Sequence, residues 1–255
     1  MPDLEAVLRA RRDAGGGLFI PYVTGGYPGV DASLLLAIQE AGADAVEVGI
    51  PFSDPVMDGG VIQEASRLAL EAGARPGDIL ATIAEASLDV PVAVMTYVNP
   101  VHRHGFEAFL SDAGRAGVAG VIVPDLPVDE ALEWTAACAD HGIASVQLAA
   151  PGTSDDRLAW IAKESAGFLY CVATYGVTGV RDELAGTARE LIGRLRPVTD
   201  LPLVVGVGVG TPAQAAEVGT FADGAVVGTA LMAELLDGDR AGMLGLVATF
   251  REALA

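Results

Sequence analysis

Short apolar segments alternate along the whole chain with amphipathic ones, and this alternation constrains the fold more than any other feature. The apolar segments, rich in Val, Ile, Leu and Ala, predict strands at 18–23, 44–50, 91–97, 117–123, 144–150, 167–173, 201–207 and 224–228. The intervening segments have helical periodicity, as at 31–42, 61–73, 105–117, 129–142, 155–167 and 211–224. This pattern is typical of βα units, because parallel strands are covered on both faces and are almost continuously apolar.

Glycine marks the ends of the predicted helices. The sequences "AGAD", "AGVAG", "HGIAS", "SAGF" and "FADG" each lie just before a predicted strand, where Gly can end a helix in the left-handed conformation. Strand, helix and Gly recur at roughly 25–30 residues, the length of one βα unit. Eight such units in 255 residues favour a closed (β/α)₈ barrel, or TIM barrel, and a doubly wound open sheet is the alternative.

The units are predicted to form one α/β barrel domain over residues 1–255, since no linker or change in composition separates a second domain. A helix is expected before the first strand. Extra helices are expected in the second and eighth βα units, and the one in the second unit falls within 75–90.

Charge and targeting signals exclude several classes of protein. A formal net charge of −19 argues against binding nucleic acid or an anionic membrane through general electrostatics. The N-terminal segment lacks the apolar region of a signal peptide, and no apolar run is long enough to cross a bilayer, so the cytoplasm is the expected location. Neither the cysteines nor the "HRH" sequence has partners at metal-ligand spacing, and no metal site is expected.

Two carboxylates stand out in "VEVGIPFSDPVMDGG", residues 46–60. Glu47 lies inside an apolar strand, near the carboxyl end, where barrels of this kind place their active sites. Burial raises the pKa of such a carboxyl, so Glu47 could exchange protons near neutral pH, or it could pair with an arginine. Asp58 follows in the next loop, either as a functional partner of Glu47 or as a helix N-cap, and Asp54 could form an Asx-turn.

Glycine-rich turns after the last two strands indicate a phosphate site. "VGVGVGTP" (205–212) and "VVGTA" (226–230) each lead from a strand into a helix, where backbone N–H groups can bind phosphate and Thr229 can add a hydroxyl. Glycine for tight packing is the alternative, and the spacing does not match a dinucleotide-binding motif. After the sixth strand, Thr178 and Gly179 could close over a ligand phosphate. The single lysine, Lys163, lies within a helical segment, so a Schiff-base mechanism is not expected.

Six segments, in order and over nearly the whole chain, resemble the tryptophan synthase alpha subunit family. They are "FIPYVTGGYPG", "GADAVEVGIPFSDPVMDG", "MTYVNP", "VPDLPVDEA", "GFLYCVATYGVTG" and "VVGVGVGTPAQAAEV…GAVVGTA". The resemblance implies a (β/α)₈ barrel that cleaves indole-3-glycerol phosphate to indole and glyceraldehyde 3-phosphate without a cofactor. It implies that Glu47 is the acid–base catalyst, that Asp58 interacts with the indole N–H and that Tyr170 supports the site.

The same resemblance assigns the remaining roles. The residues implied to hold the phosphate are Gly179, Gly208, Gly228 and Thr229, with Thr178 in the closing loop. The residues implied to line the indole pocket are Tyr22, Ile62, Met95, Tyr97 and Val207. The residues implied to contact a beta subunit or to relay signals to it are Pro51, Asp54 and Asn99.

Departures from the family pattern leave two alternatives open. Gly60 stands where the family usually has Pro, and residues 173–175 differ from the usual Ser-Arg sequence. These changes motivate a stand-alone indole-3-glycerol phosphate lyase that releases free indole, with or without ring substituents. A non-catalytic regulatory subunit that binds a phosphorylated ligand is an alternative of another class, although both carboxylates are present.

Overall fold

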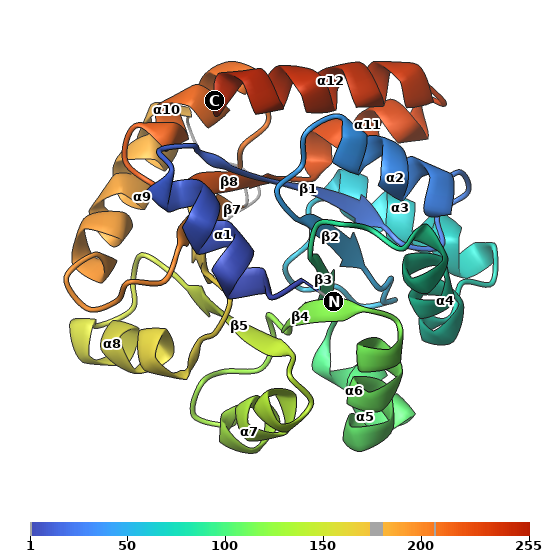
Figure 1. Cartoon of the computed structure of the whole chain (residues 1–255), viewed down its shortest axis with the longest axis horizontal. Coiled ribbons are helices and arrows are strands. Elements are labelled where there is room, and N and C mark those ends of the chain that lie inside the picture. Colours follow the sequence, from blue (N-terminus) through green and yellow to red (C-terminus); the bar gives the residue numbers. More distant parts are fainter. Residues whose placement is uncertain (1, 174–180, 207) are drawn as a thin grey trace.

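The computed structural model describes residues 2–173, 181–206 and 208–255, and its strands form a closed parallel barrel in the order β1 to β8 (Figure 1). The strands are β1 Leu18–Thr24, β2 Val46–Gly49, β3 Val92–Met95, β4 Val118–Ile122, β5 Ala144–Ala149, β6 Leu169–Val172, β7 Leu203–Gly206 and β8 Gly224–Val227. Most are shorter than the apolar runs predicted, because the runs extend beyond the paired residues at one or both ends of the strand.

Closure of the barrel distinguishes between the two folds that the sequence allowed. β1 pairs in parallel with β2 on one side and with β8 on the other, with Leu18 opposite Gly224. An open sheet has two unpaired edges, whereas here the first and last strands pair with each other. The (β/α)₈ barrel prediction is therefore confirmed.

Helices surround the barrel and follow the predicted order. They are α1 Leu4–Asp13, α2 Ala32–Glu40, α3 Gly60–Glu71, α4 Pro76–Ala86, α5 Val98–His104, α6 Phe106–Arg115, α7 Leu132–Asp140, α8 Asp155–Glu164, α9 Arg181–Leu195, α10 Pro212–Gly219, α11 Thr229–Leu236 and α12 Arg240–Ala253. The N-terminal helix and the second helices of units two and eight (α4 and α12) are as predicted. The short α5 in unit three was not predicted, because its sequence buries only Val101 and shows no apolar periodicity.

The N-terminal helix closes one end of the barrel, and Figure 1 shows α1 lying across that opening. Leu4 is 2% exposed, and its side chain packs against two glycines inside the barrel. A Cβ atom would lie 2.6 Å from Leu4 Cδ2 at Gly120 and 2.8 Å from it at Gly167. The amino end is therefore filled, which leaves the carboxyl ends of the strands as the open face for a site.

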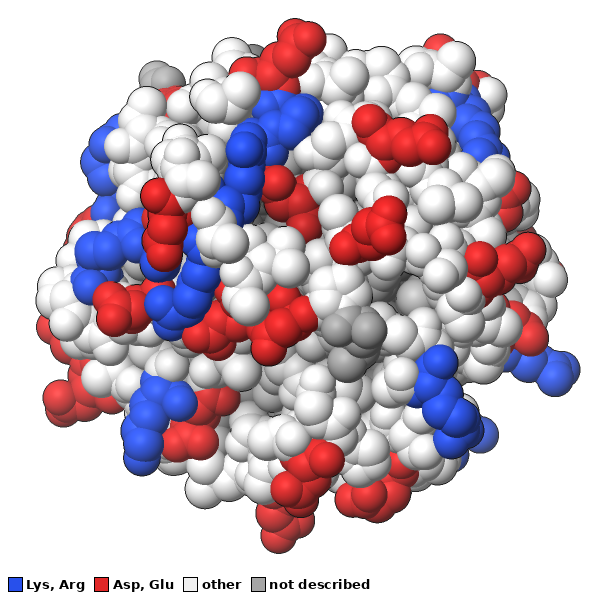
Figure 2. Space-filling view, in the orientation of Figure 1, with Lys and Arg blue, Asp and Glu red and all other residues white. Residues whose placement is uncertain are grey.

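The face that carries α1 holds both signs of charge, and Figure 2 shows its blue and red side chains intermingled. Arg251 donates to Asp44 at 2.6 Å, and Arg196 pairs with Asp223 at 2.9 Å. Paired charges make this face a poor anion-binding surface. No helix in the described part of the chain has both the length and the apolar character to cross a membrane.

Glycine at helix ends has the predicted conformation at three of the five sites. Gly42, Gly117 and Gly142 have positive φ and directly follow the C-cap residues of α2, α6 and α7, as a left-handed helix end requires. Gly167 also has positive φ, but it lies beyond the extended C-cap of α8, Ser165. The Gly of "FADG" does not end a helix either. Gly224 begins β8, where a Cβ atom would lie 2.1 Å from the Leu18 carbonyl oxygen, so close approach of β1 and not helix termination requires glycine there.

Candidate active site

Glu47 lies inside the barrel on β2, beside Tyr22 of β1 in the strand register. Its side chain is 1% exposed, and neither carboxylate oxygen has a hydrogen-bond partner among the described residues. Burial, and then the nearby charge of Asp58, raise the pKa of Glu47 to about 8. No arginine pairs with it among the described side chains, so this part of the chain gives no support to the ion-pair interpretation. Glu47 is largely protonated at neutral pH and is available to a ligand.

Asp58 lies in the loop between β2 and α3 and shares the electrostatic environment of Glu47. The N-cap of α3 is Gly59, so the capping interpretation of Asp58 is wrong. The Tyr97 hydroxyl acts on its carboxylate and lowers its pKa, and this hydroxyl accepts the Met57 N–H at 3.2 Å. Burial raises the pKa of Asp58, and the bond from Tyr97 opposes that rise. Two carboxyl groups with different surroundings can take different roles in acid–base chemistry.

Two tyrosines complete the interior around Glu47. Tyr22 and Tyr170 are 7% and 8% exposed. Burial raises the pKa of each phenol above its ordinary range, and the charges of Glu47 and Asp58 raise it further. The two tyrosines therefore share one polar interior with both carboxyl groups, as expected if they belong to one site.

Strand glycines that the sequence did not single out make room for these rings. A Cβ atom at Gly49 would lie 2.1 Å from the Tyr22 hydroxyl oxygen, and one at Gly206 would lie 2.2 Å from the Tyr170 ring. Both positions are the last residues of their strands. The available signal was a glycine that ends an apolar strand segment, but that signal does not say which side chain the glycine accommodates.

The other predicted pocket residues lie on elements that surround this interior. Ile62, in the first turn of α3, and Tyr97, just before α5, are 7% and 2% exposed. Met95 is half-buried and is the last residue of β3. Val207 lies outside the described residues.

The residues predicted to bind phosphate follow strands β7 and β8, where the last two βα units pass from strand to helix. Gly228 is the N-cap of α11, and Thr229 is its exposed first residue. Gly208 follows β7 and has a φ of +107°, a conformation that favours glycine. Thr178 and Gly179 lie outside the described residues. The N-terminus of α11 and the turn after β7 thus offer backbone N–H groups from two consecutive units.

The predicted partner residues lie at the same end of the barrel, on the β2–α3 loop and on α5. Pro51 is buried directly after β2, Asp54 is exposed in the following loop, and Asn99 is exposed within α5. The Asp54 carboxylate accepts a hydrogen bond from the Ser53 hydroxyl at 2.6 Å.

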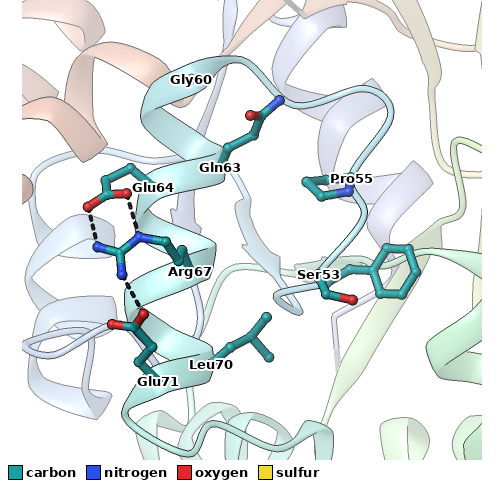
Figure 3. A pocket seen from close by; sticks show the side chains of 9 residues that line it. Ser53, Pro55, Gly60, Gln63, Glu64, Arg67, Leu70 and Glu71 are labelled. Carbon is teal, nitrogen blue, oxygen red and sulfur yellow. Dashed lines mark hydrogen bonds and ion pairs between the residues drawn. The ribbon is translucent and has the colours of Figure 1, made fainter.

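A separate cavity of about 570 Å³ lies between the β2–α3 loop and helix α3 (Figure 3). Its wall includes Phe52, Pro55 and Leu70. Its charged side chains are already paired, because Arg67 binds Glu64 at 2.6 Å and Glu71 at 2.5 Å. Neither Glu47 nor Asp58 lines it, so this cavity is distinct from the interior site.

The fold and the site together define a (β/α)₈ barrel with a protonatable carboxyl group and a second carboxylate at the carboxyl ends of its strands. Residues 8–247 match the family model described as "Tryptophan synthase alpha chain". The tryptophan synthase alpha chain of Streptomyces avermitilis is 44% identical over 92% of this chain and 87% of its own. That of Mycobacterium tuberculosis is 46% identical over 86% of this chain and 82% of its own.

Solved structures give the same result. Tryptophan synthase from Mycobacterium tuberculosis superposes with a TM-score of 0.91 and 40% identity, covering 98% of this chain and 97% of that chain. A tryptophan synthase alpha chain from Legionella pneumophila gives 0.89 and 32%, covering 100% and 97%. The chain belongs to the tryptophan synthase alpha chain family, a family of lyases in tryptophan biosynthesis.

Proposed function

We propose that the chain cleaves indole-3-glycerol phosphate to indole and glyceraldehyde 3-phosphate, as the alpha subunit of tryptophan synthase. The observation that carries this proposal is the buried Glu47 carboxyl group, which has no partner among the described residues and a pKa of about 8. Such a group can both give and take a proton at neutral pH. Family membership supports the choice of substrate.

Glu47 performs both proton transfers. In the first, its carboxyl group protonates C3 of the indole ring and converts the ring into an indoleninium ion. In the second, the Glu47 carboxylate takes the proton from the hydroxyl group on the side-chain carbon attached to C3. The bond between C3 and that carbon breaks, its electron pair returns to the ring, and the carbon becomes the aldehyde of glyceraldehyde 3-phosphate. Glu47 ends the cycle protonated, as it began.

Asp58 stabilises the charge that this sequence creates. Positive charge develops on the ring nitrogen when C3 is protonated, and the Asp58 carboxylate accepts the ring N–H. The interaction is stronger in the transition state than in the neutral substrate, which is the requirement for catalysis. Tyr22, Tyr97 and Tyr170, together with Ile62 and Met95, enclose the ring.

The phosphate binds at the far end of the substrate, at the N-terminus of α11 and the turn after β7. Gly228 and Gly208 let the backbone approach an anion, and the helix N-terminus supplies unpaired N–H groups. The Thr229 hydroxyl adds a donor. Thr178 and Gly179, which lie outside the described residues, are proposed to complete this site from the loop after β6.

The proposed partner is a tryptophan synthase beta subunit, which would receive the indole. Pro51 and Asp54 follow β2 and Asn99 lies in α5, which follows β3, so all three lie at the carboxyl ends of these strands, the end from which the product would leave. Solved relatives are structures of tryptophan synthase, which supports assembly with such a subunit.

Indole release from indole-3-glycerol phosphate tests the chemistry. Glu47→Gln keeps the shape of the side chain but cannot transfer protons, so the rate is expected to fall by roughly 100-fold or more. Glu64→Gln, on the outer surface of α3, is the matched control and keeps the wild-type rate. Equal rates for wild type and Glu47→Gln would refute the assignment. Adding a tryptophan synthase beta chain is expected to raise the rate. High activity unaffected by that chain would instead indicate a stand-alone lyase.

A further inference from the structure

We propose that Tyr97 is a positioning residue, whose hydroxyl group clamps the β2–α3 loop and orients the Asp58 carboxylate toward the substrate. This inference rests on the proposed function, because it concerns how Asp58 reaches the indole nitrogen. It differs from the role in the indole pocket that the sequence suggested, which requires only the tyrosine ring. The hydroxyl group is what matters here.

The loop that carries Asp58 needs such an anchor. It runs from 50 to 59 between β2 and α3, and Val56 within it is 75% exposed. The Tyr97 hydroxyl accepts the Met57 N–H at 3.2 Å, and the same hydroxyl lowers the pKa of the next residue, Asp58. One oxygen atom therefore fixes the loop at Met57 and acts on the adjacent carboxylate. The Tyr97 ring also packs on Phe52, at the start of the loop, with 5.3 Å between ring centroids.

Tyr97 is itself held by the neighbouring strand and loop. It is 2% exposed and lies between β3 and α5. The Thr96 N–H donates to the Ile122 carbonyl oxygen of β4 at 3.0 Å. The Val98 N–H donates to the Asp125 carboxylate at 2.9 Å. Because both of its neighbours are tied to the β4 unit, Tyr97 links the position of Asp58 to a rigid part of the barrel.

A second contact to Asp58 cannot replace this clamp. Gln63 Nε2 donates to the Asp58 carbonyl oxygen at 2.7 Å, and Figure 3 shows Gln63 in the first turn of α3 beside the loop. That bond fixes the backbone but leaves the carboxylate free to rotate. Gln63 is also exposed, where water competes for the same acceptor. The orientation of the Asp58 carboxylate therefore depends on Tyr97.

The clamp also favours the ionised form of Asp58. The titratable groups that face Asp58 are Glu47 of β2, Tyr22 of β1, Tyr170 of β6 and Tyr97 itself. Of these, Tyr97 is the group whose hydrogen bond lowers the pKa of Asp58. Loss of the hydroxyl group therefore shifts Asp58 toward its neutral form, which cannot stabilise positive charge on the indole ring.

The test is Tyr97→Phe, which keeps the ring and removes the hydroxyl group. We expect kcat/KM for indole-3-glycerol phosphate to fall roughly tenfold, mainly through kcat, because the Asp58 contact strengthens in the transition state. The acid limb of the kcat/KM profile moves to higher pH. The matched control is Tyr27→Phe, which removes a hydroxyl group bonded to the Leu235 carbonyl oxygen at 3.1 Å, away from the site. This control keeps the wild-type rate and pH profile.

Carboxyl-labelled aspartate and ¹³C NMR give a readout independent of turnover. The pKa of Asp58 rises in Tyr97→Phe and stays at its wild-type value in Tyr27→Phe. An unchanged pKa of Asp58 together with an unchanged rate in Tyr97→Phe would overturn the clamp. Failure of the wild type to release indole would overturn the proposed function instead, and the NMR titration would still decide whether the clamp exists.

A second variant guards against misfolding of Tyr97→Phe. Site-specific 3-fluorotyrosine at Tyr97 preserves the ring and makes the hydroxyl group a stronger donor. The pKa of Asp58 and the acid limb then move to lower pH, opposite to the effect of phenylalanine. A shift in the same direction as that of Tyr97→Phe would contradict a hydrogen-bond mechanism.

Discussion

Replacing Glu47 with glutamine is expected to change how the stability of the protein depends on pH. In the folded chain the pKa of Glu47 rises from 4.5 to about 8, chiefly because the carboxylate loses its hydration. The folded state therefore binds this proton more tightly than the unfolded state. The contribution of Glu47 to the free energy of unfolding is therefore fully present below about pH 4.5. It decreases as the pH rises toward about 8 and is constant above that.

The magnitude follows from the two pKa values. Each pH unit between them lowers the free energy of unfolding by about 1.4 kcal/mol, so the full loss above pH 8 is about 5 kcal/mol. Between about pH 6 and about pH 9 the loss is roughly 2 to 3 kcal/mol. Glutamine at this site is neutral throughout, so Glu47→Gln gains that much stability relative to wild type over the interval.

Urea unfolding, followed by the fluorescence of Trp134 and Trp160, measures this difference at each pH. The Glu64→Gln control lies on the exposed surface of α3, where Arg67 lowers the pKa of the Glu64 carboxyl. Its carboxylate is ionised throughout the interval, so its stability difference from wild type is constant. A difference between Glu47→Gln and wild type that is equally constant would refute the desolvation argument.

Two further predictions concern the same interior. Asp58→Asn removes the charge that contributes to the raised pKa of Glu47, so this pKa falls below about 8. A ¹³C NMR titration of Glu47 measures the change. An unchanged value would mean that burial alone sets the pKa. Gly206→Ala places a Cβ atom 2.2 Å from the Tyr170 ring and is expected to cost about 1–3 kcal/mol and lower activity. Gly245→Ala in α12, where the added atom meets open space, gains about 1 kcal/mol and keeps activity; the reverse order in urea unfolding would contradict this packing.

Local sequence patterns were sufficient to predict the order of the strands and helices and the end of the barrel that carries the site. Apolar strands, helical periodicity and glycine helix ends depend on neighbouring residues, and these features predicted eight βα units. The position of Glu47 near the end of an apolar strand predicted burial and a raised pKa, because its neighbours in sequence already imply an apolar environment. The family motifs added candidate roles that neither periodicity nor composition could supply.

Barrel closure decided what the local patterns left open. An N-cap role for Asp58 was compatible with its sequence, but the structure caps α3 with Gly59, and the Tyr97 hydroxyl lowers the pKa of the Asp58 carboxyl. Those two residues lie on different βα units, so only the pairing of β2 with β3 brings their units together. The same reasoning applies to Gly206 and Tyr170, which adjoin across β6 and β7. Neighbouring residues along the chain are enough to predict burial, but which buried side chains meet depends on the register of the closed sheet, because these contacts join different strands.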